Sequence, residues 1–226
     1  MEKEIIITRD GSNSIAVPKL NVTYHSIHGA IQESKHVFIE AGLNHVLNNV
    51  TNQPLCIFEM GFGTGLNALL TALEAEKYQR KIFYTAVEAF PLSIEEVKGL
   101  NYSELLEHKD WFQQIHESDW QEDVRITPHL TLRKERVDLI NYSSHQRFNL
   151  IYYDAFAPSV QPELWTKEIF EKLFLMLQHG GVLVTYCSKG DVRRAMIAAG
   201  FDVEKLTGAP GKREMLRATR PTQGSN

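Results

Sequence analysis

The sequence has few of the features that mark secreted or membrane proteins. Only two cysteines occur in 226 residues, Cys56 and Cys187, and both lie in apolar runs far apart in the chain. This usage is typical of reduced, buried thiols. No apolar run approaches the roughly 20 residues that a membrane-spanning helix needs, and Met1-Glu2-Lys3-Glu4 lacks the pattern of a signal peptide. We therefore expect a cytoplasmic protein with no membrane partner.

Metal-ligand spacing is also absent. None of the nine histidines stands at the distance from acids or cysteines that a zinc site requires, so no metal is expected. The formal net charge of −4 does not by itself indicate nucleic-acid binding. From Ser188 onward, however, eight lysines and arginines stand against four acids. This basic end either faces a phosphate backbone or is a solvated helix face with a polar terminus, and charge alone leaves both open.

Strand and helix patterns alternate from Leu55 onward. Compact apolar runs predict strands, and segments with apolar residues at helical spacing separate them. The expected strands are Leu55–Met60, Ile82–Glu88, Leu130–Arg133, Phe148–Asp154, Val182–Cys187, Phe201–Leu206 and Arg213–Thr219. The alternation predicts an α/β, Rossmann-like fold, with a seven-stranded, mostly parallel sheet and helices on both faces.

The first 50 residues have a different pattern. Two β-prone runs flank Asp10-Gly11, and apolar residues then recur at helical spacing from Ile31 to Leu47. We therefore expect a small β-hairpin and helix extension over residues 1–50 and the α/β domain over residues 51–226.

A glycine-rich loop follows the first strand of the α/β series. It reads Glu59-Met60-Gly61-Phe62-Gly63-Thr64-Gly65. Ligands of such sheets bind at the carboxyl ends of strands, where glycines let the backbone turn sharply and approach a ligand. Leu66 fills the position of the third glycine of a dinucleotide fingerprint, and the Gly-Lys-Ser/Thr of a P-loop is absent. The spacing instead resembles motif I of S-adenosylmethionine-dependent, class I methyltransferases; a tight turn without ligand is the alternative.

An acid also ends the next strand. Glu88 can accept hydrogen bonds from the two hydroxyls of a ribose, although NAD enzymes use an acid at the same place, and an exposed strand-end glutamate is the alternative. Phe90 follows it and either forms a wall of the adenine pocket or packs in the core. Glu88 therefore indicates a ribose without identifying the cofactor.

The fourth strand of the series leads into Asp154-Ala155-Phe156-Ala157-Pro158. Methyltransferases present the acceptor atom at this place. A primary alkylammonium has a pKa near 10, like that of lysine, so a carboxylate is suited to accept its N–H bonds and help it lose a proton. Asp154 is therefore the predicted catalytic residue, with a compatible N-cap role as the alternative. Trp165 either lines the acceptor pocket, stacking on a base, or packs in the core.

Several motifs together resemble one family, the tRNA 5-methylaminomethyl-2-thiouridine methyltransferases, or MnmC-like methyltransferase domain. The glycine loop is generic, whereas the Asp154–Pro158 motif and the Lys-Arg-Glu-Met near the end are more specific. The motifs are Glu33–Glu40 (ESKHVFIE), Glu59–Asn67 (EMGFGTGLN), Glu88–Leu92 (EAFPL), Asp154–Pro158 (DAFAP) with Pro162 and Trp165, Gly180-Gly181 and Lys212–Met215 (KREM).

This resemblance implies a cofactor, S-adenosyl-L-methionine, and a reaction. The enzyme would methylate the 5-aminomethyl group of the wobble (2-thio)uridine in the tRNA anticodon stem-loop, giving 5-methylaminomethyl. Family members often have Gly-Asp after the third strand, near adenine, whereas this chain has Lys134-Glu135-Arg136-Val137-Asp138, so Glu135 or a backbone amide is assigned there. The implied cofactor contacts are Glu59, Gly61, Phe62, Gly63, Thr64, Gly65, Asn67, Glu88, Phe90 and Glu135.

The resemblance also implies contacts to the substrate. They are Phe156, Pro158, Trp165, Lys212 and Arg213. The last two would touch RNA phosphate or the loop over the active site, or they form a surface pair. The family domain is often fused to an FAD-dependent oxidoreductase, for which this chain has no room, so we expect a stand-alone enzyme linked in function to a separate oxidoreductase. The sequence does not indicate an oligomeric state.

Two other functions remain open from the sequence. One is a methyltransferase of the same fold acting on a small-molecule amine, which the acidic body of the chain favours. The other is a non-catalytic S-adenosylmethionine-binding module. The intact set of Glu59, Glu88 and Asp154 argues against that module, because a decayed enzyme has no physical need for all three.

Overall fold

A large mixed sheet is the centre of the computed structural model, which describes residues 2–50 and 53–222. The strand order is β10-β11-β9-β8-β4-β5-β7-β6. The strands are β4 (Leu55–Met60), β5 (Ile82–Val87), β6 (Asp123–Arg125), β7 (Leu130–Glu135), β8 (Phe148–Tyr153), β9 (Leu177–Thr185), β10 (Asp202–Thr207) and β11 (Glu214–Thr219). Neighbours from β9 to β7 pair in parallel, whereas β11 and β6 are antiparallel to their partners. The predicted mostly parallel α/β fold is confirmed.

The predicted count of seven strands is wrong, because the sheet has eight. The additional strand, β6, pairs with β7 at the edge of the sheet and has only three residues, of which Val124 alone is half-buried. Such a short exposed segment carries no periodic signal in the sequence. The neighbouring strand β7 also runs to Glu135, two residues beyond the predicted end at Arg133.

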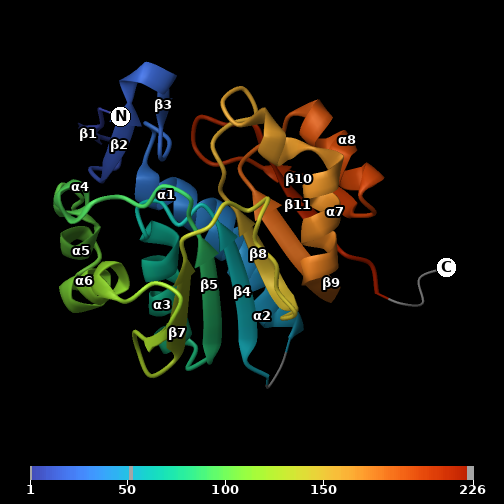
Figure 1. Cartoon of the computed structure of the whole chain (residues 1–226), viewed down its shortest axis with the longest axis horizontal. Helices are drawn as coiled ribbons and strands as arrows, with labels where there is room; N and C mark the ends of the chain where they lie inside the picture. The colour runs from blue at the N-terminus through green and yellow to red at the C-terminus, as the bar shows by residue number, and fades with distance from the viewer. Residues whose placement is uncertain (1, 51–52, 223–226) are drawn as a thin grey trace.

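Helices cover both faces of the sheet (Figure 1). Alternate residues of a strand face opposite sides, so Leu150 and Tyr152 pack in one core and Ile151 and Tyr153 in the other. The first core is covered by α1 (Ala30–Ser34), the π-helical segment η2 (Lys35–Asn44), α2 (His45–Asn49), α3 (Leu66–Lys77), α4 (Ile94–Lys98), α5 (Tyr102–Leu105) and α6 (Lys109–Glu117). The second is covered by α7 (Lys167–Met176) and α8 (Gly190–Ala198).

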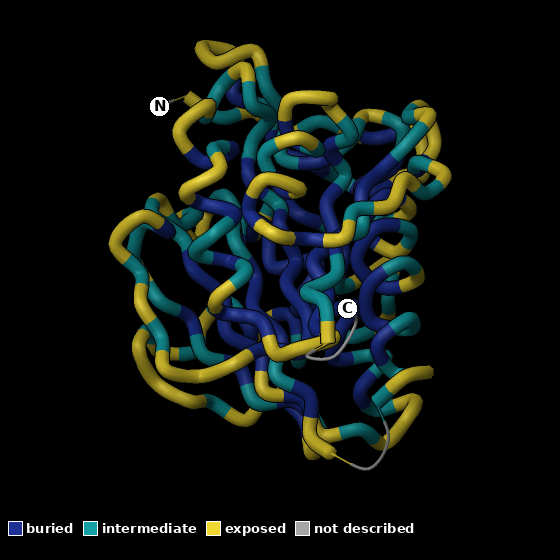
Figure 2. Tube along the Cα trace, turned by 90° about the vertical axis from the view of Figure 1, so that its right-hand side faces the viewer, coloured by how far each residue is buried: buried dark blue, intermediate teal, exposed yellow. Residues whose placement is uncertain are grey.

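Burial follows this layered arrangement. Figure 2 shows the buried residues concentrated in the central strands and the exposed residues in the loops around them. No helix in the described part of the chain is long and apolar enough to cross a membrane.

The N-terminal segment forms a second, smaller sheet. Its strands β1 (Glu4–Ile7), β2 (Asn13–Val17) and β3 (Val22–Thr23) are antiparallel, in the order β1-β2-β3. The predicted hairpin is confirmed and extended by β3, and a short turn, η1 (Pro18–Leu20), joins β2 to β3. The helical segment that follows packs on β8, β9 and α3. The proposed domain boundary falls at residues 51 and 52, outside the described residues, and stays a prediction.

Candidate active site

The glycine loop joins β4 to α3 at the carboxyl edge of the sheet. Gly61, Gly63 and Gly65 have φ angles of 89°, 50° and 69°, which side chains other than glycine rarely adopt. A Cβ at Gly61 would lie 2.7 Å from the backbone oxygen of Asp154. The loop therefore passes directly against the end of β8 and leaves no space there for a side chain.

Glu88, at the end of β5, holds this loop in place. Its Oε2 accepts a hydrogen bond from the Gly63 amide at 3.1 Å, and its Oε1 accepts one from the Phe90 amide at 2.9 Å. A carboxylate has about four acceptor sites. Each oxygen of Glu88 therefore keeps capacity for one more donor, such as a ribose hydroxyl.

Asn67, in the first turn of α3, bridges two carboxylates. Its Nδ2 donates to Oε1 of Glu59 at 2.9 Å and to Oδ2 of Asp154 at 3.0 Å. Glu59 is buried, and its Oε2 accepts no hydrogen bond of ordinary length from the described residues. Burial raises the pKa of Glu59 well above its usual range, and the nearby Asp154 carboxylate raises it further. The buried Tyr84 hydroxyl also lies beside this carboxyl group and lowers its pKa.

Asp154 follows β8, whose six residues are all buried. Burial raises the pKa of Asp154 to about 7, and the Glu33 carboxylate also raises it, whereas the Asn67 hydrogen bond and the Lys212 ammonium lower it. A carboxyl group with a pKa near neutrality exchanges protons readily at physiological pH. The environment of Asp154 is thus suited to a general base.

A cavity of about 440 Å³ lies between the glycine loop and the loop after β8. The predicted site residues that line it are Gly61, Phe62, Gly63, Thr64, Asn67, Glu88, Phe90, Asp154 and Phe156. The predicted residues outside its lining are Glu59, Gly65, Glu135, Pro158, Trp165, Lys212 and Arg213. The structure therefore brings residues predicted for the cofactor and residues predicted for the acceptor together in one cavity, whereas the other predicted residues do not line it.

Trp165 supports the acceptor loop from behind. It belongs to the short helix η3 (Pro162–Trp165) and is buried. Its Nε1 donates to the Phe156 oxygen at 2.8 Å, and its ring packs edge-on against Tyr153 and Tyr186. In this arrangement the indole holds the loop rather than presenting a face to the cavity.

The residues that line the cavity after β7 lie further along the chain than Glu135, which the sequence had assigned to adenine. Glu135 pairs with Arg133 at 2.6 Å, and the cavity is lined instead by the residues that follow it, Arg136 to Leu139. Because β7 extends two residues beyond its predicted end, the loop at its carboxyl end starts later. Phe90 lies at the cavity with 78% of its surface exposed, so its ring forms part of a rim.

The sequence did not indicate the N-terminal side of the cavity. Tyr24 meets Phe156 edge-on, with ring centroids 5.2 Å apart, and a Cβ at Gly63 would lie 3.2 Å from its Cδ1. His25 lies beside it, and its Nε2 is 2.7 Å from Oγ1 of Thr64. Burial lowers the pKa of His25 to about 4, so its ring is neutral at physiological pH. Both residues follow β3 in a loop, where no periodicity reveals their direction.

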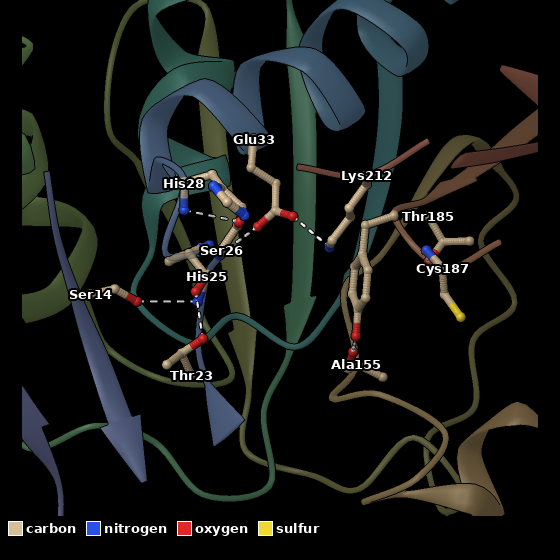
Figure 3. A network of polar contacts seen from close by, with 11 residues as sticks. Ser14, Thr23, His25, Ser26, His28, Glu33, Ala155, Thr185, Cys187 and Lys212 are labelled. Atoms are coloured by element: carbon tan, nitrogen blue, oxygen red, sulfur yellow. Dashed lines mark hydrogen bonds and ion pairs between the residues drawn. The ribbon is translucent and has the colours of Figure 1, made fainter. Parts of the chain in front are cut away.

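Lys212 and Arg213 are adjacent in sequence but lie in different surroundings. The Lys212 side chain points toward Glu33 (Figure 3), with its Nζ 2.6 Å from Oε1 of Glu33 and 3.9 Å from the centre of the Tyr186 ring. The Arg213 side chain is 91% exposed. Of this pair, Arg213 therefore has its charged group open to solvent, whereas the Lys212 ammonium is held by neighbouring side chains.

Comparisons with known proteins agree with this geometry. The sequence matches, over residues 94–221, a family described as S-adenosyl-L-methionine-dependent methyltransferase. It is 34% identical over 206 residues to the tRNA 5-methylaminomethyl-2-thiouridine biosynthesis bifunctional protein MnmC of Leptospira interrogans, covering 85% of this chain and 32% of that protein. The protein of the same name from Cupriavidus metallidurans is 31% identical over 231 residues, covering 95% and 33%. The chain thus spans about a third of the length of these relatives.

Solved structures share the fold. MNMC2 from Aquifex aeolicus superimposes with a TM-score of 0.80 at 23% identity, covering 98% of this chain and 71% of that one. Spermidine synthase from Thermotoga maritima has a TM-score of 0.57 at 14% identity, covering 96% and 68%. At these identities the likeness shows the arrangement of strands and helices.

Proposed function

We propose that this chain, which belongs to the family of S-adenosyl-L-methionine-dependent methyltransferases, methylates the 5-aminomethyl group of the wobble (2-thio)uridine in tRNA. The observation that carries the proposal is the carboxylate of Asp154, which faces the cavity at the end of β8, beside the cofactor loop. A carboxylate there is suited to an amine acceptor. The relatives named for 5-methylaminomethyl-2-thiouridine biosynthesis support the choice of this amine.

The cavity residues fit the cofactor of this family. Glu59, which lies behind the lining and is joined to it by Asn67, would act on the methionine ammonium through water, and Glu88 would accept hydrogen bonds from the ribose hydroxyls. The glycine loop would hold the cofactor against its backbone, in a position that depends on the close fit of Gly61 against the end of β8. Asp138 and its neighbours, which line the cavity after β7, would contact the adenine in place of Glu135. When bound, the cofactor supplies an electrophilic methyl group on a sulfonium.

Asp154 prepares the acceptor nitrogen. The aminomethyl group reaches the site as an ammonium, which has no lone pair. Asp154 accepts a hydrogen bond from the N–H group of this ammonium and then takes the proton. The covalent N–H bond breaks and an O–H bond forms on the carboxyl group. The freed lone pair would then form the new N–C bond as the methyl C–S bond breaks, with the electron pair of that bond remaining on sulfur, and the product would leave as a secondary ammonium. Positioning by the Asn67 hydrogen bond keeps the carboxylate directed at this nitrogen.

The proposed partners of this enzyme are tRNA and an oxidoreductase that acts before it. Arg213 would contact the phosphates of the anticodon stem-loop, since its guanidinium is exposed to solvent. A separate FAD-dependent oxidoreductase would supply the aminomethyl group by removing a carboxymethyl group from the same nucleoside. Since both proposed steps would act on tRNA, we expect the enzyme to work in the cytoplasm.

Transfer of a labelled methyl group tests the proposal. The full chain would be incubated with labelled S-adenosyl-L-methionine and tRNA that carries the unmethylated aminomethyl group, with fully modified tRNA as the control. Label should appear in the wobble nucleoside of the first tRNA and not in the second. Absence of label from both, or equal transfer to a free alkylamine, would refute the proposed substrate.

A further inference from the structure

Two segments from opposite ends of the chain meet close to Asp154. Glu33 lies in α1, and Lys212 lies in the loop between β10 and β11. Their side chains are 9% and 33% exposed, and the Lys212 Nζ is 2.6 Å from Oε1 of Glu33. The second oxygen of Glu33 accepts the Ser26 amide hydrogen at 2.8 Å. The Glu33 carboxylate is thus buried with both oxygens occupied, and Lys212 supplies its counter-charge.

The contacts continue from Lys212 to the acceptor loop. Its Nζ lies over the Tyr186 ring, 3.9 Å from the centre, which is a favourable place for a cation. The Tyr186 hydroxyl donates to the backbone oxygen of Ala155 at 2.8 Å. Ala155 directly follows Asp154, so the position of Lys212 is transmitted to the backbone that carries the carboxylate.

The same pair acts on Asp154 through charge. The Glu33 carboxylate raises the pKa of Asp154 and the Lys212 ammonium lowers it. The other polar groups around Asp154 come from three further directions: Asn67 on α3, the buried Glu59 and Tyr84 on β4 and β5, and Tyr186 after β9. Among these groups Lys212 is the only cation in the described part of the chain.

We propose that Glu33 and Lys212 are positioning residues for Asp154, and that Lys212 holds the acceptor carboxylate in place instead of binding RNA phosphate. The inference rests on the proposed role of Asp154 as the base that accepts a proton from the amine. A phosphate contact needs an ammonium that is free to leave its partner, whereas this one is held by a buried carboxylate and an aromatic ring. Neither residue lines the cavity, so each would affect the reaction through residues that do, and Asp154 is the one on which both act.

The test compares four variants of the full chain: Lys212→Met, Lys212→Arg, Glu33→Gln and the control Lys205→Met. Lys205 lies on the same hairpin but pairs with Glu214 at the surface. The midpoint of the acid side of the kcat profile should rise by about 0.5–1 pH unit in Lys212→Met and fall by a similar amount in Glu33→Gln, because opposite charges have been removed. The midpoint of Lys212→Arg should stay close to that of the wild type, and the midpoint of Lys205→Met should equal that of the wild type.

A second measurement separates this inference from the proposed substrate. The Asp154 carboxyl group can be titrated by carbon-13 NMR in each variant without any methyl acceptor, and the same opposite shifts should appear. If the wild type methylates no tRNA but the carboxyl shifts occur, the substrate proposal fails and the positioning role stands. Unchanged midpoints in Lys212→Met and Glu33→Gln would overturn the positioning role. So would a Lys212→Met variant whose only defect is a weaker salt dependence of tRNA affinity.

Discussion

The Nδ2 atom of Asn67 lies 3.0 Å from Oδ2 of Asp154. The same atom donates to Glu59, so a single amide joins the acceptor side of the cavity to its cofactor side. Because the two carboxylates repel each other, the amide hydrogens between them stabilise an arrangement that would otherwise be unfavourable. The bound ammonium of a cofactor would act on the same pair.

Replacement of Asn67 by leucine should damage both sides of the site. Without the amide, the pKa of Asp154 rises, since the Asn67 hydrogen bond lowers it in the wild type. We expect kcat at pH 7 to fall roughly tenfold and to recover partly at pH 9, as is usual for a base whose pKa has risen. Steady-state kinetics across this range measures the effect, with the exposed Asn49→Leu in α2 as the control. A loss that is the same at every pH would contradict this account.

The wild-type rate should depend on pH through Asp154. The group must be ionised to accept a proton, and its pKa is raised to about 7. The value of kcat should therefore increase as the pH rises from 5 through 7 and then level off. Asp154→Asn should abolish this dependence and lower kcat by about 10²–10⁴, while calorimetry should show the affinity for S-adenosyl-L-methionine unchanged. Loss of cofactor affinity in this variant would show that Asp154 belongs to the cofactor site.

Alanine at Gly61 should prevent cofactor binding. Its φ of 89° strains an alanine, and the new Cβ would lie 2.7 Å from the Asp154 backbone oxygen, which has no freedom to move aside. We expect affinity for S-adenosyl-L-methionine to fall by at least about tenfold, the equivalent of 1.4 kcal/mol.

Gly11 provides the matched control for this variant. It has a similar φ of 83°, but no atom lies within 4 Å of its added Cβ. Gly11→Ala therefore introduces the backbone strain alone, and should lower thermal stability slightly while leaving cofactor affinity intact. Equal loss of affinity in both variants would mean that strain, and not the close approach to β8, explains the effect.

Arg213 is expected to contribute to tRNA affinity through charge. Its exposed guanidinium is 3.9 Å from Glu214, a pair too loose and too solvated to hold it. Arg213→Gln should reduce the slope of log affinity against log salt by about one, the amount expected for one lost phosphate contact. Lys77→Gln is the control, because Lys77 is the last residue of α3, at the end of the helix away from the glycine loop. A slope that is the same in both variants would remove Arg213 from the RNA contacts.

The sequence predicted the parts of this molecule that local patterns determine. Buried strands such as Phe148–Tyr153 are continuous apolar runs, and the glycine loop has a fixed spacing after the first of them. Both are properties of a few neighbouring residues, so the cofactor side of the cavity was predictable in position. The exposed three-residue strand β6 has no such pattern and was missed.

The remaining walls of the site depend on contacts that are distant in sequence. Tyr24 reaches Phe156 across the cavity, and Glu33 reaches Lys212 from the other end of the chain. Neither pairing follows from periodicity or spacing, because each depends on where the small N-terminal sheet and the last hairpin lie on the main sheet. The sequence motifs did include Glu33 and Lys212, but without a structure the buried pair could not be distinguished from two separate surface charges.

The pairing of Glu33 with Lys212 also has a consequence for the order in which the protein matures. The two residues are 179 positions apart, so a ribosome delivers Glu33 long before its cation. A buried carboxylate without its partner is strongly unfavourable, so the region around α1 completes its packing only after β11 has joined β9. We therefore expect the surroundings of Asp154 to be completed only after the last hairpin has been synthesised and has joined the sheet.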